Sequence, residues 1–236
     1  MVNFKDLLIE DVGADGVGRI RKIDKNGRFY HVVQRAANRD NIYDKEIANY
    51  RENRLCKICA MYNVVIVFSV VMTNHTHDVL MAENWELIAQ VLKLVNSAVA
   101  RKVRKRNSKK YAYGRNVFEE TPFYRAIHDV IALMVVGKYV FDNANSVELK
   151  GGFVPYSCFS FLKKGYVIKP YNKNLYPMIF GLSELELCTL YAQNDLAQIQ
   201  EIAKSRFKNW TQHDNDLLFK ADISVSWLPD TETLRL

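Results

Sequence analysis

The segment from Asn63 to Met81 constrains the fold of this chain more than any other part of its sequence. It begins with NVVIVFSVVM, a nearly continuous β-branched run that is typical of a strand buried on both faces. The run stops at the turn signal Thr73-Asn74 and is followed by a second strand pattern, HTHDVLM. We therefore expect two paired strands, the first of them fully buried.

Patterns on either side of this strand pair predict the rest of the fold. β-branched and aromatic residues indicate strands over residues 28–35 and 121–127. Apolar residues at helical spacing indicate helices over residues 43–61, 85–106 and 128–143. The order strand, helix, paired strands, helix, strand, helix predicts an α+β fold, in which helices pack on an antiparallel sheet in the ferredoxin-like manner.

Two adjacent glycines, Gly151 and Gly152, mark the expected edge of this domain. We divide the chain into an N-terminal lead (1–27), a main domain (28–150) and a C-terminal extension (151–236). The capping pattern Ser183-x-x-Glu186 predicts that a helix begins within the extension.

The sequence argues against several classes of protein. Its longest apolar run, Val64 to Met72, is far shorter than the ~20 residues of a membrane-spanning helix, and its N-terminus is too acidic for a secretory signal. Cys56 and Cys59 lie close together, but a second pair that would complete a four-thiolate zinc site is missing. We expect a soluble, cytoplasmic protein without membrane contact, in which these two cysteines are buried on a helix.

Positive charge is concentrated in one short segment. The formal net charge is +7, and seven of the ten residues from 101 to 110 are basic. A helix end whose cations complement the helix dipole would explain two or three of them. Phosphate neutralisation with neighbouring aromatic rings is the pattern of proteins that bind single-stranded nucleic acid. The predicted contacts are Arg101, Lys102, Arg104, Lys105, Arg106, Lys109, Lys110, Tyr111, Tyr113 and Arg115.

Two histidines begin the second strand of the central pair. His75 and His77 are two residues apart on a strand, so both imidazoles should project from one face and could bind the same cation. Paired histidines also occur as ordinary polar residues of strands. Their place directly after a buried strand and the turn MTN favours a metal site, because a rigid scaffold presents ligands well.

A tyrosine and an asparagine share one face of the expected helix over residues 128–143. Tyr139 and Asn143 are four residues, or about one turn, apart. A tyrosine hydroxyl can act as a nucleophile when a metal or cations activate it, and an asparagine can offer its amide oxygen as a ligand. By spacing alone, packing and surface roles explain this pair better.

Four segments resemble one known family. VVMTNHTHDVLM is similar to the M-P-N-H-x-H core of the IS200-like transposases, in the HUH endonuclease superfamily, and RFYHVVQRAANR resembles that family's opening strand with its H-x-x-x-R run. KYVFDNANSVEL resembles the Y-I-x-x-N-P-V helix of the REP-associated tyrosine transposases, and PYSCF resembles the W-S-S-Y stretch that follows it. The four segments occur in the family's order over residues 28–160.

The resemblance implies a role for each matching residue. Tyr139 would be the catalytic nucleophile, and His75, His77 and Asn143 would bind a divalent metal, Mg²⁺ or Mn²⁺. The implied supporting residues are His31, Arg35 and Asn74. The chain departs from the family pattern at Thr73, Asp78 and Ala144. Strand alternation predicts that Asp78 points away from the histidines.

The resemblance also implies a function. Such an enzyme nicks and rejoins single-stranded DNA at hairpin-forming ends through a covalent 5′-phosphotyrosine, as a monomer or a homodimer, in the cytoplasm at the nucleoid. The extension would be helical and contact DNA. Two alternatives stay open: a domesticated hairpin-binding protein without transposition activity, and a metal-dependent phosphodiesterase that uses water.

Overall fold

The computed structural model describes residues 29–111, 114–148, 175–211 and 214, with residues 144–148 described by their backbone alone. The elements in chain order are β1 (Phe29–Arg35), the 3-10 helix η1 (Ala37–Arg39), α2 (Lys45–Met61), β2 (Val65–Val71), β3 (His75–Met81), α3 (Trp85–Arg106), β4 (Phe123–Ile127), α4 (Val130–Glu148), α6 (Leu175–Phe180), α7 (Glu184–Gln193) and α8 (Leu196–Arg206).

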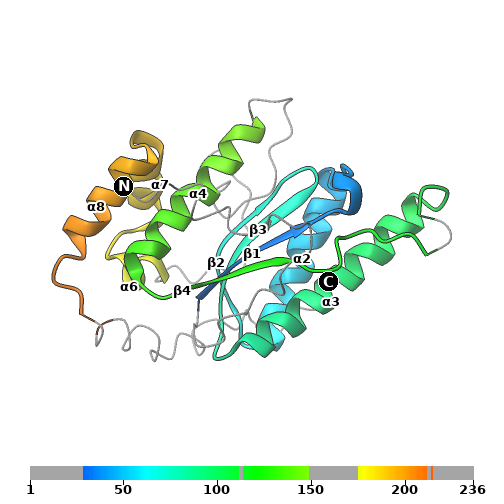
Figure 1. Cartoon of the computed structure of the whole chain (residues 1–236), viewed down its shortest axis with the longest axis horizontal. Coiled ribbons are helices and arrows are strands. Elements are labelled where there is room, and N and C mark those ends of the chain that lie inside the picture. The colour runs from blue at the N-terminus through cyan, green and yellow to red at the C-terminus, as the bar shows by residue number, and fades with distance from the viewer. Residues whose placement is uncertain (1–28, 112–113, 149–174, 212–213, 215–236) are drawn as a thin grey trace, which may run out of the picture.

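The four strands form one antiparallel sheet in the order β2-β3-β1-β4 (Figure 1). The nearly continuous apolar run is β2, whose seven residues are all buried, and β3 lies between it and β1. This order and the helices packed on the sheet confirm the predicted α+β fold.

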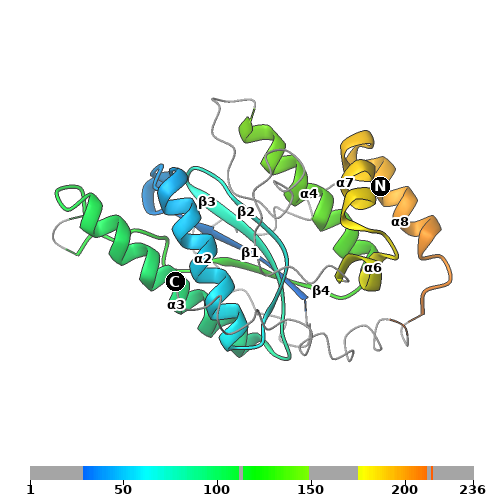
Figure 2. The same ribbon diagram turned by 180° about the vertical axis from the view of Figure 1, so that it is seen from behind.

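Helices cover both faces of the sheet. Helices α2 and α3 lie side by side on one face, and α4 lies on the other with α6 and α8 beside it (Figures 1 and 2). We call these the α2 face and the α4 face. Side-chain caps define where α2 and α3 begin, because Asp44 accepts a hydrogen bond from the backbone N–H of Ile47, and Asn84 accepts one from Leu87.

Most details of α2 agree with the sequence prediction. Cys56 and Cys59 are buried, and burial raises the pKa of both thiols. Met61 is the last residue of α2 and is 75% exposed.

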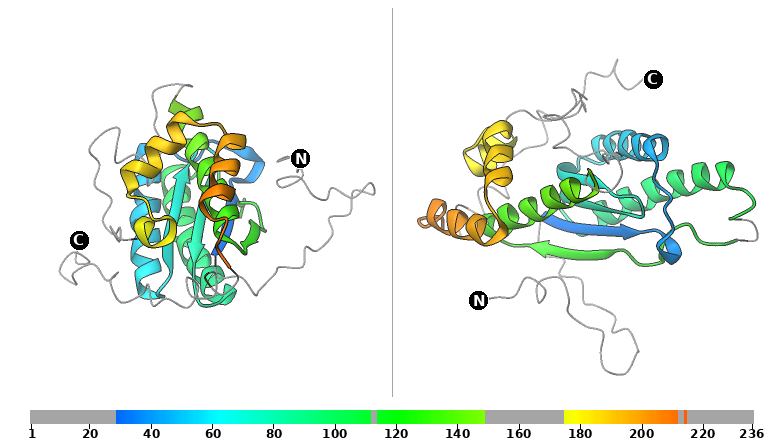
Figure 3. Two further views of the ribbon diagram at one scale, coloured as in Figure 1. Left: turned by 90° about the vertical axis from the view of Figure 1, so that its left-hand side faces the viewer. Right: turned by 90° about the horizontal axis from the view of Figure 1, so that it is seen from above.

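The C-terminal helices α6, α7 and α8 lie beside α4 (Figure 3), and their buried residues belong to the hydrophobic core. The Tyr176 hydroxyl donates to the carbonyl oxygen of Val67 in β2 at 2.9 Å, and the Tyr191 hydroxyl donates to that of Met134 in α4 at 2.7 Å. Ser183 and Glu186 form the predicted capping box at the start of α7. The division at residue 151 lies outside the described residues and stays a prediction.

None of the described helices combines the length and the apolarity that crossing a lipid bilayer requires.

Candidate active site

Strand β3 directs alternate side chains to opposite faces of the sheet. His75 lies opposite Arg35, and His77 lies opposite Val33, in the pairing of β3 with β1. The ring centroids of His75 and His77 are 4.9 Å apart, so both imidazoles lie on the same face, as the alternation predicts. Tyr139 of α4 contacts the His77 ring, which identifies this face as the α4 face.

A third imidazole, from β1, holds His77. Nε2 of His31 lies 3.1 Å from Nδ1 of His77, and the two rings stack with their centroids 5.3 Å apart. Both side chains are buried. The other ring nitrogen of His77, Nε2, is buried without a hydrogen-bond partner in the described part of the chain. An unpaired buried polar atom is destabilising, so its presence points to a ligand that completes it.

His75 is held by its neighbour in the chain. Nδ1 of His75 lies 2.6 Å from Oδ1 of Asn74, which can only accept, so the His75 Nδ1–H donates this hydrogen bond. The tautomer leaves Nε2 of His75 with its lone pair. Asn74 in turn donates through Nδ2 to the backbone oxygen of Arg39 at 3.3 Å. Both histidines of β3 therefore have one nitrogen held by a neighbour and the other suited to a metal.

Burial and nearby cations keep the three imidazoles neutral. Burial, together with the charges of Arg35 and Arg39, lowers the pKa of His75 to about 4. Burial and the charge of Arg125 lower the pKa of His31 to about 4, and burial followed by the other two histidines lowers the pKa of His77 well below its ordinary value. Neutral imidazole is the form that binds a metal ion.

Helix α4 brings Tyr139 to these histidines. The half-buried Tyr139 ring lies 5.3 Å from the His77 ring and 6.0 Å from the His31 ring, both edge to face. Gly137 allows this close approach, because a Cβ atom there would lie 2.5 Å from the Tyr191 hydroxyl and 2.7 Å from the Phe68 ring. The glycine thus fixes how near the tyrosine lies to the sheet.

Asn143 follows Tyr139 by one helical turn and donates through Nδ2 to the backbone oxygen of Tyr139 at 3.0 Å. Across the described residues, no cluster of three His, Cys, Asp or Glu side chains could hold a metal.

Arginines surround the histidines on this face. Arg35 lies on β1 opposite His75, and Arg125 lies on β4 opposite His31. Arg125 shares one face of β4 with Phe123 and Ile127, and sequence reasoning missed it. Only the register of β4 against β1 reveals which face it occupies.

The α2 face of the same strand carries a different polar cluster. The buried Arg51 guanidinium forms ion pairs with Glu52 and Asp78, and the Ser69 hydroxyl donates to Asp78 Oδ1 at 2.8 Å. This confirms that Asp78 points away from the histidines. We call Arg51, Glu52, Ser69 and Asp78 the arginine cluster, and sequence reasoning missed it because Arg51 looked like a surface residue of α2.

The basic segment at the end of α3 divides into paired and unpaired cations. Lys102 pairs with Glu46 at 2.8 Å, Arg106 with Asp44 at 2.5 Å, and Lys110 with Asp40 at 3.0 Å. A guanidinium nitrogen of Arg104 lies 3.5 Å from the backbone oxygen of Arg115. The exposed cations that form no ion pair within the described residues include Arg101, Lys105 and Lys109.

The structure corrects the predicted role of Tyr111. Its side chain is 5% exposed, and its hydroxyl donates to Oδ2 of Asp40 at 3.1 Å. Burial and this carboxylate raise its pKa to about 12. Tyr111 is therefore a core residue and does not present its ring for base stacking. Tyr113 lies outside the described residues.

The family described as "Transposase IS200 like" matches residues 25–143, just over half of the chain, and this range contains every residue of the site above. The chain therefore belongs to the IS200-like transposase family. No curated protein matches the chain by sequence.

Two solved structures are similar to this one. The first is a proposed transposase from Deinococcus radiodurans R1, with 19% identity, coverage of 54% of this chain and 96% of that chain, and a TM-score of 0.37. The second is a REP-associated tyrosine transposase bound to a REP hairpin, with 15% identity, coverage of 66% and 90%, and a TM-score of 0.40. The family assignment rests on the sequence match.

Proposed function

We propose that this transposase nicks and rejoins single-stranded DNA through Tyr139, with a covalent 5′-phosphotyrosine between the two steps. One observation carries the proposal: the Tyr139 ring lies 5.3 Å from His77, whose buried Nε2 is without a partner in the described part of the chain. A nucleophile beside an incomplete ligand set is the arrangement that metal-assisted phosphoryl transfer needs.

The protein ligands of a divalent metal, Mg²⁺ or Mn²⁺, would be Nε2 of His75, Nε2 of His77 and the amide oxygen of Asn143. The fit rests on the ring nitrogens, because Asn74 accepts from Nδ1–H of His75, His31 contacts Nδ1 of His77, and Nε2 of His77 has no partner within the described residues. When bound, such a metal polarises the scissile phosphate as a Lewis acid.

The side chains divide the remaining work. Arg35 and Arg125 place positive charge on the face where a phosphate must lie. The Tyr139 hydroxyl attacks phosphorus and loses its proton, the bond to the 3′ oxygen breaks, and that oxygen takes up a proton. A later 3′-OH reverses the attack and releases the tyrosine, so rejoining requires no ATP.

The substrate in this proposal is DNA with hairpin-forming ends. The exposed cations Arg101, Arg104, Lys105 and Lys109 at the end of α3 would hold its backbone. The enzyme would act as a monomer or a homodimer, at the nucleoid in the cytoplasm, with the C-terminal extension contributing further DNA contacts.

The test is a denaturing gel with hairpin oligonucleotides taken from the DNA that flanks the gene. Wild-type protein should cut the DNA and give a protein band shifted by a covalent adduct. Tyr139→Phe should lower both by at least about a thousandfold, because water is not positioned to replace the nucleophile. Hairpin binding should persist, since the change removes only one oxygen.

Tyr50→Phe is the matched control, because Tyr50 lies on α2 and its hydroxyl accepts from Arg54 at 3.2 Å. This control should cut and form the adduct at the wild-type rate. If Tyr139→Phe still cuts without forming the adduct, the chain is a phosphodiesterase that uses water, and if it still forms the adduct, another tyrosine is the nucleophile. If the wild-type protein binds hairpins without cutting any, it is a binding protein.

A further inference from the structure

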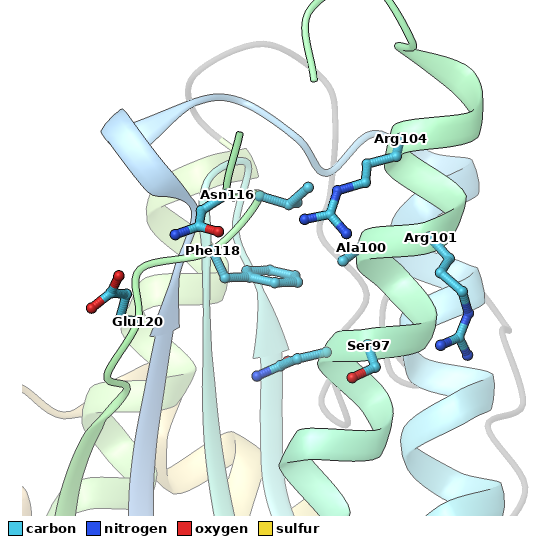
Figure 4. Close-up of a pocket in the computed structure, with 9 residues that line it drawn as sticks. Ser97, Ala100, Arg101, Arg104, Asn116, Phe118 and Glu120 are labelled. Atoms are coloured by element: carbon cyan, nitrogen blue, oxygen red, sulfur yellow. The ribbon is translucent and has the colours of Figure 1, made fainter. Parts of the chain in front are cut away.

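A hollow of about 560 Å³ opens on the α3 side of the sheet, away from Tyr139 (Figure 4). It lies between α3 and residues 116–120, which connect the end of α3 to β4. Its lining combines one aromatic ring with two arginines, two asparagines and a glutamate. A hollow of this size, with a few polar groups around an aromatic wall, is typical of ligand sites.

The aromatic wall is Phe118. This residue pairs with Ala36 in an isolated antiparallel bridge, which gives its side chain the same face as Ala36. The ring is half-buried and packs against Tyr43, with centroids 6.5 Å apart. Figure 4 shows it directed from the strand toward α3, into the hollow.

Partly buried hydrogen bonds hold the polar wall. Asn96 of α3 donates through Nδ2 to Oε1 of Gln34 at 2.8 Å. The buried Gln34 in turn donates to the backbone oxygens of Arg35 at 3.1 Å and Glu119 at 3.3 Å. The orientation of the Asn96 amide is therefore fixed before any ligand binds, and its oxygen is available as an acceptor.

We propose that this hollow binds one unpaired nucleotide of the DNA substrate. The base stacks on Phe118, the amide oxygen of Asn96 receives a hydrogen bond from its edge, and Arg104 binds the adjoining phosphate. The proposal rests on the proposed function, because it takes DNA as the substrate, and it adds a site at which an unpaired base is read.

Backbone hydrogen bonds connect this hollow to the histidines. The Ala36 N–H donates to the oxygen of Asn74 at 2.8 Å, and the Glu119 N–H donates to that of Arg35 at 3.0 Å. Phe118 and His75 thus lie on segments two strand spacings apart, about 10 Å across the sheet. A single DNA strand with one base held in the hollow can continue around this end of the sheet to Tyr139. The bound base would then set the position at which the DNA is cut.

Photochemical crosslinking tests the proposal with the full chain. The probe is a random-sequence single-stranded DNA in which iodouracil replaces thymine, since light crosslinks this base to an aromatic ring on which it stacks. Peptide mass spectrometry should find the main adduct on Phe118. Phe118→Leu keeps apolar packing against Tyr43, and it should remove that adduct and weaken binding about tenfold. Arg104→Gln should lower the yield of the Phe118 adduct, because the ring is still present but the adjoining phosphate is bound less tightly.

Tyr62→Leu is the control, because Tyr62 is a half-buried aromatic at the end of α2. It should leave the Phe118 adduct unchanged. Bound DNA that crosslinks elsewhere but not to Phe118 would overturn the hollow as a base site, as would a failure of the probe to bind. The adduct of Tyr139 with hairpin DNA is measured separately, so failure of the proposed function is distinguishable. A crosslink at Phe118 without a Tyr139 adduct would keep the base site and reject the nicking reaction.

Discussion

The two faces of β3 bury polar side chains in different states. On the α2 face, the arginine cluster pairs its cation with two carboxylates and a hydroxyl. On the α4 face, three neutral imidazoles lie together, and the Nε2 atom of His77 is without a partner within the described residues. Residues adjacent in the chain, His77 and Asp78, thus belong to different kinds of site.

The difference separates stability from function. A buried charge that is fully paired holds its surroundings in one arrangement, and removal of one partner is costly. A buried nitrogen without a partner destabilises the fold, and proteins retain such atoms where a ligand completes them. We therefore expect the α2 face to determine unfolding and the α4 face to determine chemistry.

The largest effect on stability should come from Asp78→Asn. This change leaves Arg51 with half of its compensating charge, so the free energy of unfolding in urea should fall by about 3–5 kcal/mol. His77→Gln on the neighbouring position should lower it by no more than about 1 kcal/mol, because only one hydrogen bond, to His31, is altered. DNA cleavage should be lost in His77→Gln. If both variants lost the same free energy of unfolding, the two faces of β3 would not differ in their contribution to stability.

The packing of α4 against the sheet gives a second test. Gly137→Ala adds a methyl group against Phe68 and Tyr191, so it should lower the free energy of unfolding by about 1–3 kcal/mol, although alanine favours helices. Adduct formation at Tyr139 should fall as well, since the helix must move. Val136→Ala, at the half-buried neighbouring position, should keep most of the adduct. If Gly137→Ala raised the free energy of unfolding instead, α4 would not pack closely against Phe68 and Tyr191.

Glu52 allows a test through pH. Burial outweighs the Arg51 charge and raises the pKa of Glu52 above its ordinary 4.5. A carboxyl whose pKa is raised on folding stabilises the protein below its unfolded pKa, and this contribution is lost as pH rises through the folded pKa. Glu52→Gln should therefore gain stability relative to wild type as pH rises above about 4.5, on the order of 1 kcal/mol. Thermal melts across this range measure it, and a constant difference would argue against the raised pKa.

The smallest effect concerns the unpaired and paired cations at the end of α3 and in the residues just after it. The double variant Lys105→Gln/Lys109→Gln should reduce the slope of log K against log salt for DNA binding by up to ~2 units. Lys102→Gln/Arg106→Gln should reduce it less, because Glu46 and Asp44 already neutralise these cations. Titrations at several salt concentrations give both slopes. A larger change in the second variant would show that DNA displaces the ion pairs.

Residue patterns predicted the elements of the sheet closely. The periodicity of the apolar residues found β3 and α3 at their observed bounds and β1 to within one residue. Alternation also placed the histidines on one face and Asp78 on the other. These features depend on neighbours in the chain, which a single sequence contains.

The missed features depend on contacts between distant segments. Arg51 looks like a solvated helix residue until Asp78 and Ser69, far along the chain, are known to lie beside it. Tyr111 looks exposed beside the basic run, but Asp40 and the core bury it. The pairing of Lys102 and Arg106 with the start of α2 likewise requires the packing of two helices. No spacing rule within one segment reports such pairs.

The helices that pack beside α4 are translated after it, and this order has a consequence for when the site can form. The ribosome makes the sheet and both histidine strands first, whereas the helices that pack beside α4, including Tyr191 with its hydrogen bond to Met134, are made afterwards. A nascent chain that ends before α6 therefore contains His75, His77 and Tyr139 but lacks part of the packing that seats the tyrosine helix. If the proposed function holds, the chain would become competent to cut DNA only late in its own translation.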